Sequence, residues 1–479
     1  MTHTGIATPE YRYFLAGAWR AGAPYTIACP YDGAPVGIVH RAGPEQLEQA
    51  IHAAVEAFET TRRLPGHKRA AALRTISASI ASQAEDLART LALEAGKPIK
   101  QARIEVSRAI QTFATAAEEA TRMRDEFLRL DSVPPGEGRQ GILKRFPVGP
   151  IAAITPFNFP LNLVAHKLAP AIAAGCPVVL KPASQTPISA LRLAAIIAES
   201  GWPPTALSVL PLSSDDAAPL VEDERFKLLT FTGSPAVGWD MKRRAGRKKV
   251  TLELGGNAGV IVHSDTDLAY AAERCVVGGY SYAGQSCISV QRIFVHEPVY
   301  EEFMDYFVPR VRALKVGHPL DEATDLGSLI SASDGARVAA WLDEARAAGA
   351  ECLVGGEVRG GVVQPTVVVK ASPELRVNRQ EIFAPVVTVQ TYGAFDDALR
   401  AVNDSVYGLQ AGLFTRDVRR IFQAFETLEV GGVIIDDVPT WRVDPMPYGG
   451  VKQSGFGREG LKYAIEELTE PKLLVLSLP

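Results

Sequence analysis

One of the five cysteines stands apart from the other four. Cys287 lies in "YSYAGQSCISVQRIFV" (residues 280–295), among glycine, serine and glutamine, and a strand-like run follows it. A sulfur in such a polar turn is reachable, and a cysteine thiolate is a strong nucleophile. The others have the apolar surroundings of small core residues: Cys29, Cys176, Cys275 and Cys352. We therefore interpret Cys287 as a candidate nucleophile, the alternative being an inert buried thiol.

Polar side chains also stand where predicted strands end. Glu253 closes a β-type run in "TLELGGNAG", and Asn158 follows another in "ITPFNFPLNLVAHK". In "LTFTGSPAVG" a strand ends at Thr232 and Gly233, and a helix begins at Ser234. Ligands of open α/β sheets gather at the carboxyl ends of strands, so these residues are candidates for one site. The alternatives are that Glu253 caps a turn and that Asn158 bonds only local backbone.

The elements that must position these residues follow from periodicity. Residues 43–123 are predicted to be helical, with boundaries at Gly43-Pro44, Pro65-Gly66 and Gly96-Lys97-Pro98. From about residue 148, β-rich runs such as "PIAAIT" and "FKLLTFTG" alternate with helical segments. This rhythm predicts an α/β fold with a parallel sheet and helices on both faces. A second alternating region runs from about 258 to 460, and "GILKRF" and the tail "EPKLLVLSLP" look like strands without partners in either region.

Composition limits the classes of function. A chain of 479 residues predicts two or three domains, and a net charge of −4 gives no case for nucleic-acid binding. The odd number of cysteines argues against a disulfide framework. We also expect no bound metal. The apolar region 147–180 is broken by prolines and polar residues, so no membrane span is predicted. With no signal peptide visible, we expect a cytoplasmic location.

One motif is misleading. "GFGREG" (residues 455–460) matches the dinucleotide pattern G-x-G-x-x-G. The preceding "MPYGGVKQS" is not a strand, and the chain ends before an acidic partner could follow in its own βαβ unit. We reject this motif as a cofactor site.

The ordered blocks "TPFNFP", "KPAS", "FTGS", "LELGG", "GQSC", "EIFAPV" and "PYGGVKQSGFGREG" carry a family resemblance. Over essentially its full length the chain resembles the aldehyde dehydrogenase superfamily. It looks nearest to the non-acylating group that includes lactaldehyde and non-phosphorylating glyceraldehyde-3-phosphate dehydrogenases. The resemblance implies a Rossmann-like cofactor domain (1–127 and 148–255), an α/β catalytic domain (256–462) and a small β oligomerisation element (128–147 and 463–479). It also implies a dimer or tetramer.

The implied reaction is NAD(P)-dependent oxidation of an aldehyde to a carboxylic acid through a covalent thioester. Cys287 would attack the carbonyl, and the Asn158 amide with the Cys287 backbone N–H would stabilise the oxyanion. Glu253 would activate the water that hydrolyses the thioester. Lys167 and Glu459 match positions of proton networks in relatives. The alternative for Lys167 is a solvated lysine on a surface helix, and the alternative for Glu459 is a simple carboxylate at the start of a helix.

The resemblance also assigns a cofactor site. Its expected residues are Thr155, Pro156, Phe157, Lys181, Ser184, Gly233, Ser234, Val237, Leu254, Glu381 and Phe383. Many NAD-specific relatives carry a glutamate where this chain has Ser184, and that carboxylate would repel a 2′-phosphate. The cofactor is therefore expected to be NADP or NAD, with NADP favoured. The segment "LSSDDAAPL" lacks the glycine-rich motif of many relatives, which puts contacts on the adenine side in doubt.

The residues assigned to the substrate favour a small polar or anionic aldehyde, such as lactaldehyde or a short semialdehyde. They are Arg108, Phe159, Asn162, His166, Ser286 and Arg442. Guanidinium groups suit carboxylate or phosphate recognition. Ser286 replaces an arginine of phosphate-specific relatives, and Phe159 keeps one wall aromatic. The alternative for Arg108 is a helix-surface ion pair with Glu105.

Two other functions stay open at this point. The first is a relative that passes the acyl group to coenzyme A; such proteins commonly lack the glutamate of the "ELGG" block, which is present here as Glu253. The second is a non-catalytic binding protein on the same fold, which would be expected to lose the nucleophile, the amide or the base.

Overall fold

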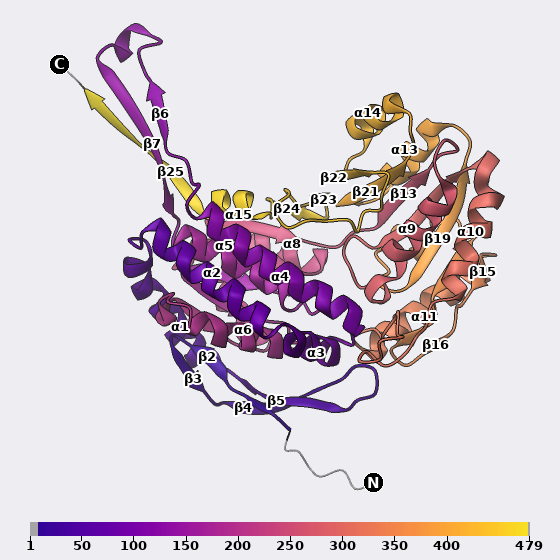
Figure 1. Ribbon diagram of the computed structural model, residues 1–479, viewed down its shortest axis with the longest axis horizontal. Coiled ribbons are helices and arrows are strands. Elements are labelled where there is room, and N and C mark those ends of the chain that lie inside the picture. The colour runs from indigo at the N-terminus through magenta and orange to yellow at the C-terminus, as the bar shows by residue number, and fades with distance from the viewer. Residues whose placement is uncertain (1–7, 478–479) are drawn as a thin grey trace.

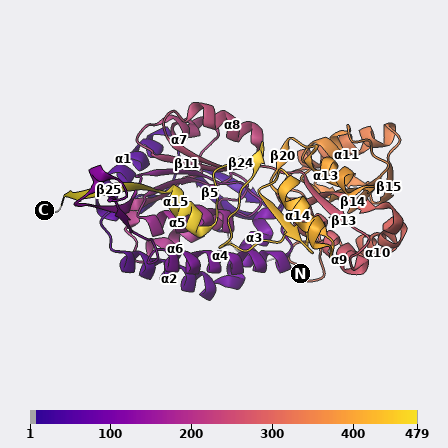
Figure 2. The same cartoon turned by 90° about the horizontal axis from the view of Figure 1, so that it is seen from above.

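The computed structural model describes residues 8–477. They form two large β-sheets with helices on their faces and a slender three-stranded ribbon (Figure 1). Seen from above, the two sheet-and-helix bodies lie side by side (Figure 2). The ribbon projects from the first body, which contains α1 and α2, on the side away from the second body, which contains β13 and β14 (Figure 2). The expected α/β class is confirmed. Residues 1–7, at the start of the expected cofactor domain, and 478–479, at the end of the expected tail strand, lie outside the described residues.

The first sheet has eight strands in the order β24-β12-β11-β8-β9-β10-β2-β3. Its central strands are parallel and match the expected runs: β8 (Ile151–Ile154), β9 (Val178–Lys181), β10 (Leu207–Val209), β11 (Leu228–Thr232) and β12 (Lys249–Glu253). The antiparallel strands are β2 (Tyr13–Leu15), β3 (Ala18–Arg20) and β24 (Gly455–Phe456). The rejected glycine motif thus begins in an antiparallel edge strand, outside any parallel βαβ unit.

Helices cover both faces of this sheet (Figure 2). The expected helical region forms α1 (Pro44–Thr61), α2 (Gly66–Ser82), α3 (Ala84–Ala95) and α4 (Ile99–Glu119). The glycine and proline boundaries are confirmed. The break between α2 and α3 at Gln83 has no such signal, because glutamine is a good helix former. The helices between strands are α5 (Asn162–Ala174), α6 (Ile188–Ala198), α7 (Ala218–Glu222) and α8 (Pro235–Arg244).

A small sheet near the N-terminus was not anticipated from the sequence. It consists of β1 (Glu10–Tyr11), β5 (Pro35–Arg41) and β4 (Ala23–Ala28) in that order. Its strands are short or poor in alternating apolar residues, so their periodicity is weak.

The second sheet has seven strands in the order β15-β18-β19-β14-β13-β21-β22, all parallel except β15. They are β13 (Ala258–Val262), β14 (Val290–His296), β15 (Glu351–Val354), β18 (Thr366–Val369), β19 (Val386–Tyr392), β21 (Gln410–Phe414) and β22 (Gly432–Ile435). Its helices are α9 (Leu268–Tyr280), α10 (Tyr300–Arg312), α11 (Ala332–Ala347), α12 (Arg376–Arg379), α13 (Phe395–Asn403) and α14 (Val418–Thr427). Short pairs complete this body: β16 (Val358–Arg359) with β17 (Val362–Val363), and β20 (Tyr407–Gly408) with β23 (Val451–Lys452). The second alternating region is therefore confirmed.

The ribbon consists of β6 (Glu126–Arg129), β7 (Arg139–Pro147) and β25 (Thr469–Ser477). β25 pairs antiparallel with β7 along its whole length, from Thr469 opposite Pro147 to Ser477 opposite Arg139. The two expected unpartnered strands therefore exist and pair with each other. α15 (Leu461–Glu467) precedes β25 and packs on α5. Within residues 8–477 no helix is long and apolar enough to cross a membrane.

Candidate active site

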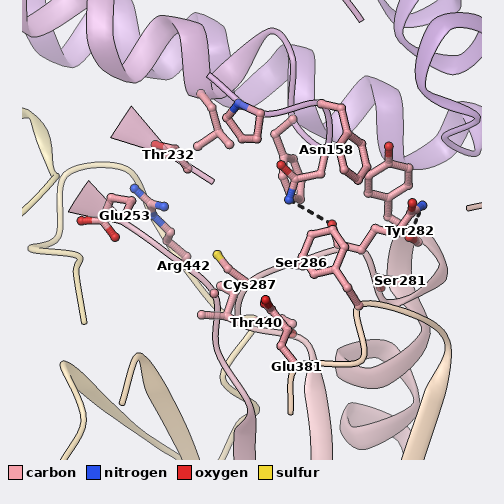
Figure 3. Close-up of a pocket in the computed structure, with 18 of the residues that line it drawn as sticks. Asn158, Thr232, Glu253, Ser281, Tyr282, Ser286, Cys287, Glu381, Thr440 and Arg442 are labelled. Atoms are coloured by element: carbon pink, nitrogen blue, oxygen red, sulfur yellow. Dashed lines mark hydrogen bonds between the residues drawn. The ribbon is translucent and has the colours of Figure 1, made fainter. Parts of the chain in front are cut away.

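A cavity of about 700 Å³ is lined by residues from both large sheet bodies. Asn158 reaches it from the loop between β8 and α5, and Glu253 from the end of β12. Cys287 reaches it from the turn before β14. Figure 3 shows these three side chains among the residues that line this cavity. The cavity thus brings together three groups that the sequence places at separate strand ends.

The turn before Cys287 has unusual backbone geometry. Tyr282 and Ala283 adopt φ values of 50° and 52°, in the left-handed region that residues with a Cβ seldom occupy. Gly284 follows with φ of 70°, and a Cβ there would lie 2.1 Å from the carbonyl oxygen of Ala384. This glycine is therefore required by both conformation and space, and the turn holds Cys287 at the cavity wall.

Cys287 is half-buried, and its sulfur lies 2.9 Å from the hydroxyl of Tyr448. Burial raises the pKa of the Cys287 thiol to about 12, against the opposing effect of the Tyr448 hydrogen bond. The resting sulfur is thus a neutral thiol. Arg442 is the cation whose charge lowers the pKa of this thiol. The exposed turn expected from the sequence is therefore a partly closed one.

The Asn158 loop is held by a buried ion pair. Lys97 donates to Glu105, and both side chains are about 1% exposed or less. Lys97 also donates to the Asn158 carbonyl oxygen at 2.8 Å, and Glu105 accepts the backbone N–H groups of Leu161 and Asn162 at 3.0 and 3.1 Å. The Asn158 amide donates to the carbonyl oxygen of the residue before Ser286, Gln285, at 3.0 Å (Figure 3).

Glu253 is buried, and neither of its carboxylate oxygens has a hydrogen-bond partner among the described residues. Burial, followed by the charge of Glu459, raises the pKa of Glu253 well above its ordinary range. A buried carboxylate without a partner is unfavourable for stability alone. Its position at the cavity wall is instead that of a group able to exchange a proton with a bound molecule.

Lys167 and Glu459 are charged groups that act on this carboxylate, and both are buried. Lys167 donates to the Thr230 hydroxyl at 2.9 Å and to Glu459 at 3.4 Å. The Glu459 carboxylate also accepts a hydrogen bond from the Arg442 guanidinium at 3.5 Å. The alternatives of a solvated lysine and a simple helix-start carboxylate are therefore wrong, because α5 faces the sheet and these groups neutralise each other inside the protein.

Comparisons with known proteins agree with this geometry. Residues 19–474 match the Aldehyde dehydrogenase family. The 3-sulfolactaldehyde dehydrogenase of Priestia aryabhattai is 42% identical over 471 residues, which cover 98% of each chain. The crystal structure of aldehyde dehydrogenase 21 from Physcomitrella patens, in complex with the reaction product succinate, is 46% identical with a TM-score of 0.97, covering 98% of this chain and 99% of that one.

The chain belongs to the aldehyde dehydrogenase family. A further relative of known structure, glyceraldehyde-3-phosphate dehydrogenase from Methanocaldococcus jannaschii complexed with NADP, is 38% identical, has a TM-score of 0.90 and covers 94% of this chain and 98% of that one. The protein is accordingly an NAD(P)-dependent aldehyde dehydrogenase that oxidises an aldehyde to a carboxylic acid.

The expected cofactor residues of this aldehyde dehydrogenase fall into two groups. Those that line the cavity are Pro156, Phe157, Gly233, Ser234, Leu254, Glu381 and Phe383; those outside it are Thr155, Lys181, Ser184 and Val237. Burial raises the pKa of Glu381 to about 7, and its carboxylate accepts the Gly256 backbone N–H at 3.0 Å. Phe383 adopts a left-handed φ of 50°. Strain of this kind is common where a backbone must present a side chain to a ligand.

These residues fit a nicotinamide dinucleotide. Lys181, at the end of β9, is buried and has no carboxylate within ion-pair distance among the described residues. Ser234 stands before the first turn of α8, where free backbone N–H groups attract an anion such as a pyrophosphate. A nicotinamide held by these residues would supply the acceptor for the hydride of the substrate.

The expected substrate residues are largely brought together. Arg108, Phe159, Asn162, Ser286 and Arg442 line the cavity, whereas His166 lies behind it. Arg108 does not pair with Glu105, so that alternative is wrong. Its guanidinium donates twice to Asp444, at 2.7 and 3.3 Å, and His166 donates to the same carboxylate at 2.7 Å. Glu105 faces inward instead, toward Lys97, because it lies on the buried side of α4.

Sequence reasoning did not identify Lys97, Glu105, Asp444 or Tyr448 as parts of the site. Lys97 lies beneath two aromatic rings, with its nitrogen 3.9 Å from the centre of Phe159 and 4.2 Å from that of Tyr282. Its position in the Gly-Lys-Pro boundary was visible in the sequence but carried only a turn signal. Tyr448 stands in the block "PYGG", which indicated the family without indicating a contact with the nucleophile.

The buried pair gives a first prediction. Glu105→Gln leaves the Lys97 ammonium buried without its charged partner, and breaking such a pair lowers the free energy of unfolding by about 3–5 kcal/mol. Urea denaturation followed by circular dichroism measures the loss. Lys97→Met combined with Glu105→Gln should recover much of it, since no charge then stays buried. Glu85→Gln, which removes an exposed partner of Arg103, is the control and should change stability little. Wild-type stability of Glu105→Gln would contradict the prediction.

Proposed function

We propose that this aldehyde dehydrogenase oxidises a small aldehyde that carries a remote anionic group, with Cys287 as its nucleophile. The proposal rests on Arg442, a buried arginine in the cavity wall whose guanidinium is only partly hydrogen-bonded. Its side chain is only 6% exposed, and its Nε has no hydrogen-bond partner among the described residues. A buried donor without a partner is unfavourable unless a ligand supplies the acceptor.

The charges around the cavity support an anion. Arg442 and Lys167 share one ionised partner, Glu459, at 3.5 and 3.4 Å. Glu253 makes no ion pair with either of them within the part of the chain that the structure describes. Two cations with one paired carboxylate leave positive charge for a substrate anion to neutralise. The names of two relatives support an anionic substrate, because 3-sulfolactaldehyde is an anion and the Physcomitrella enzyme was crystallised with the reaction product succinate, also an anion.

In the proposed reaction the Cys287 sulfur forms a bond to the aldehyde carbon, and the carbonyl electron pair moves onto oxygen. We infer that the Asn158 amide and the Cys287 backbone N–H donate to that oxyanion. After oxidation a thioester links the acyl group to sulfur. Glu253 then takes a proton from water, whose oxygen attacks the thioester and releases the acid. The raised pKa of Glu253 suits this step, because a buried carboxylate is a stronger base.

Two variants separate these roles. Cys287→Ala removes the nucleophile, so we expect no turnover while cofactor binding, measured by fluorescence titration, persists. Glu253→Gln should give a burst of one reduced cofactor per active site and then stall at the thioester. Adding coenzyme A tests the acylating alternative, which predicts continued turnover with the free thiol. Steady turnover near the wild-type rate in either variant would exclude the assigned roles.

The anion site is tested by charge removal. Arg442→Met keeps much of the apolar stem, and the loss of a hydrogen bond to a charged group should lower kcat/KM for succinic semialdehyde by about 10- to 100-fold. Lactaldehyde, which has no charge, should lose only the smaller part that comes from the higher pKa of Cys287, because Arg442 also lowers that pKa. Hexanal should be a poor substrate of the wild type. Arg274→Met is the matched control, because the Arg274 guanidinium also lines the cavity but is neutralised by Asp437 at 2.7 Å. Equal losses for both aldehydes would refute an anion site at Arg442.

For the cofactor we infer a preference for NADP. Ser184 is half-buried and follows β9, near Lys181 in the sequence. With serine in place of glutamate, no carboxylate of residue 184 would repel a phosphate on the 2′-position of the ribose. A lysine and a hydroxyl can both donate to a 2′-phosphate. The NADP complex of the Methanocaldococcus relative is in keeping with this inference.

Ser184→Glu should shift the ratio of kcat/KM for NADP over NAD toward NAD by tenfold or more, because the new carboxylate repels the phosphate. Ser184→Ala is the control for loss of the hydroxyl alone and should shift the ratio less. Steady-state rates with both cofactors measure the effect. A strong wild-type preference for NAD would contradict the inference.

We further infer that the first body binds the cofactor, that the second carries the nucleophile, and that the ribbon joins subunits into a dimer or tetramer. The ribbon exposes Phe127, Leu473, Leu474 and Val475 at 42–62%. β25 pairs with β7 on one side only within the described chain, which leaves a long edge of unpaired backbone groups. An apolar edge of this kind favours association.

Deletion of residues 470–479 should weaken that association, and Leu474→Glu should do so without shortening the chain. Size-exclusion chromatography with light scattering gives the mass of each form. Val55→Glu, at a residue 40% exposed on α1, is the control and should leave the mass unchanged. A wild-type protein that is a stable, fully active monomer would rule out this role of the ribbon.

A further inference from the structure

Tyr448 contacts the reacting sulfur, and the mechanism above does not use it. It is 3% exposed and lies between β22 and β23. Its backbone exchanges two hydrogen bonds with Glu459, of 3.0 and 2.7 Å, which fix its position. The Arg442 guanidinium lies 3.6 Å from the centre of its ring. The hydroxyl is therefore held in place from the backbone and from the ring face.

The hydroxyl has one hydrogen-bond partner among the described residues, the Cys287 sulfur at 2.9 Å. A buried hydroxyl that did not donate would leave its proton unpaired, which is unfavourable. A sulfur that carries negative charge accepts more strongly than a neutral thiol, because hydrogen bonds to ionised groups are the stronger ones. The contact therefore gains strength as the nucleophile ionises.

We propose that Tyr448 is a catalytic residue whose hydroxyl donates a hydrogen bond to Cys287 when the sulfur is a thiolate, both in attack and in release. The proposal rests on the proposed function, because it requires Cys287 to be the nucleophile. The tyrosine transfers no proton in either step. Burial, followed by the charge of Cys287, raises the pKa of Tyr448 well above its ordinary range, so the phenol keeps its proton.

The hydrogen bond acts on both steps in which sulfur changes charge. In attack, the thiol proton passes to water or to a nearby base, and the sulfur electron pair forms the bond to carbon. The neutral sulfur of the thioester then accepts only weakly. In hydrolysis, the carbon–sulfur bond breaks, its electron pair returns to sulfur, and the Tyr448 hydroxyl again faces a thiolate. Tyr448 thus stabilises the same charged atom at the start and at the end of the cycle.

Other charged groups around the sulfur make such a donor necessary. Glu381, in the segment after α12, and Glu253, at the end of β12, both act on the sulfur, and negative charge on either raises the pKa of Cys287. Arg442, in the loop before Tyr448, lowers the pKa of Cys287. A thiolate at a buried site needs positive charge or hydrogen-bond donors. Tyr448 supplies the side-chain donor that contacts the sulfur directly.

Tyr448→Phe tests the proposal, because it removes the hydroxyl and keeps the ring on which Arg442 lies. The readout is the rate at which iodoacetamide alkylates Cys287 without aldehyde, followed by mass spectrometry as the pH is raised from about 6 toward the thiol pKa of about 12. We expect the rate at a fixed pH below the thiol pKa to fall about 10- to 100-fold, and the profile to move up by about one to two pH units. The pH profile of kcat/KM should move in the same direction.

Tyr280→Phe is the matched control. Tyr280 is equally buried, but its hydroxyl donates to the carbonyl oxygen of Thr366 at 2.9 Å, away from the sulfur. It should leave the alkylation profile unchanged. Replacing Tyr448 by 3-fluorotyrosine gives a stronger donor without loss of volume, so alkylation should become faster. This second substitution decides the question if Tyr448→Phe does not fold.

The outcomes separate this proposal from the proposed function. If Cys287→Ala keeps turning over, the nucleophile is wrong and the proposed function fails. If Cys287→Ala is inactive but Tyr448→Phe alkylates and turns over with the wild-type pH profile, the role of Tyr448 is refuted. A slower rate at every pH with no shift of the profile, or a loss confined to KM, would show a packing role and would also refute it.

Discussion

The buried ion pair between Lys97 and Glu105 is the constraint on which the site depends. Removing two charges from water is costly, and the cost is offset only if every lone pair and proton finds a partner. Here the partners are the Asn158 carbonyl oxygen, the first N–H groups of α5 and two aromatic faces. The loop between β8 and α5 therefore has one favourable conformation. The Asn158 side chain is therefore positioned by the hydrogen bonds of Lys97 and Glu105 to the backbone of its loop.

The reactive groups meet because two sheets end at the same cavity. Asn158 follows a strand of the first sheet and Glu253 ends another, whereas Cys287, Glu381 and Tyr448 come from turns of the second body. Within either body alone the cavity would have one open wall. Burial of the carboxylate and the thiol, and with it their raised pKa values, is thus a property of the assembled pair of sheets.

Much of this arrangement could be read from the sequence, because it is local. The parallel strands, the helix boundaries at glycine and proline, and the strand-end positions of Asn158 and Glu253 follow from short-range periodicity. The pairing of Arg108 with Asp444 spans 336 residues and leaves no local pattern, so the nearby Glu105 was a reasonable but wrong partner. Lys167 was similarly open to misreading, because nothing in its helix shows which face meets the sheet. Charge pairing inside a core is set by tertiary packing.

One short loop, residues 440–448, has a consequence for how such an enzyme can diverge. It carries Arg442 in the cavity wall and Tyr448 on the sulfur, and the two side chains stack on each other. A substitution of Arg442 that admits a different aldehyde also removes the cation from the ring of the tyrosine. Selectivity and reactivity are therefore not independent traits in this protein. New substrate ranges are more readily acquired through parts of the cavity wall that do not touch this loop.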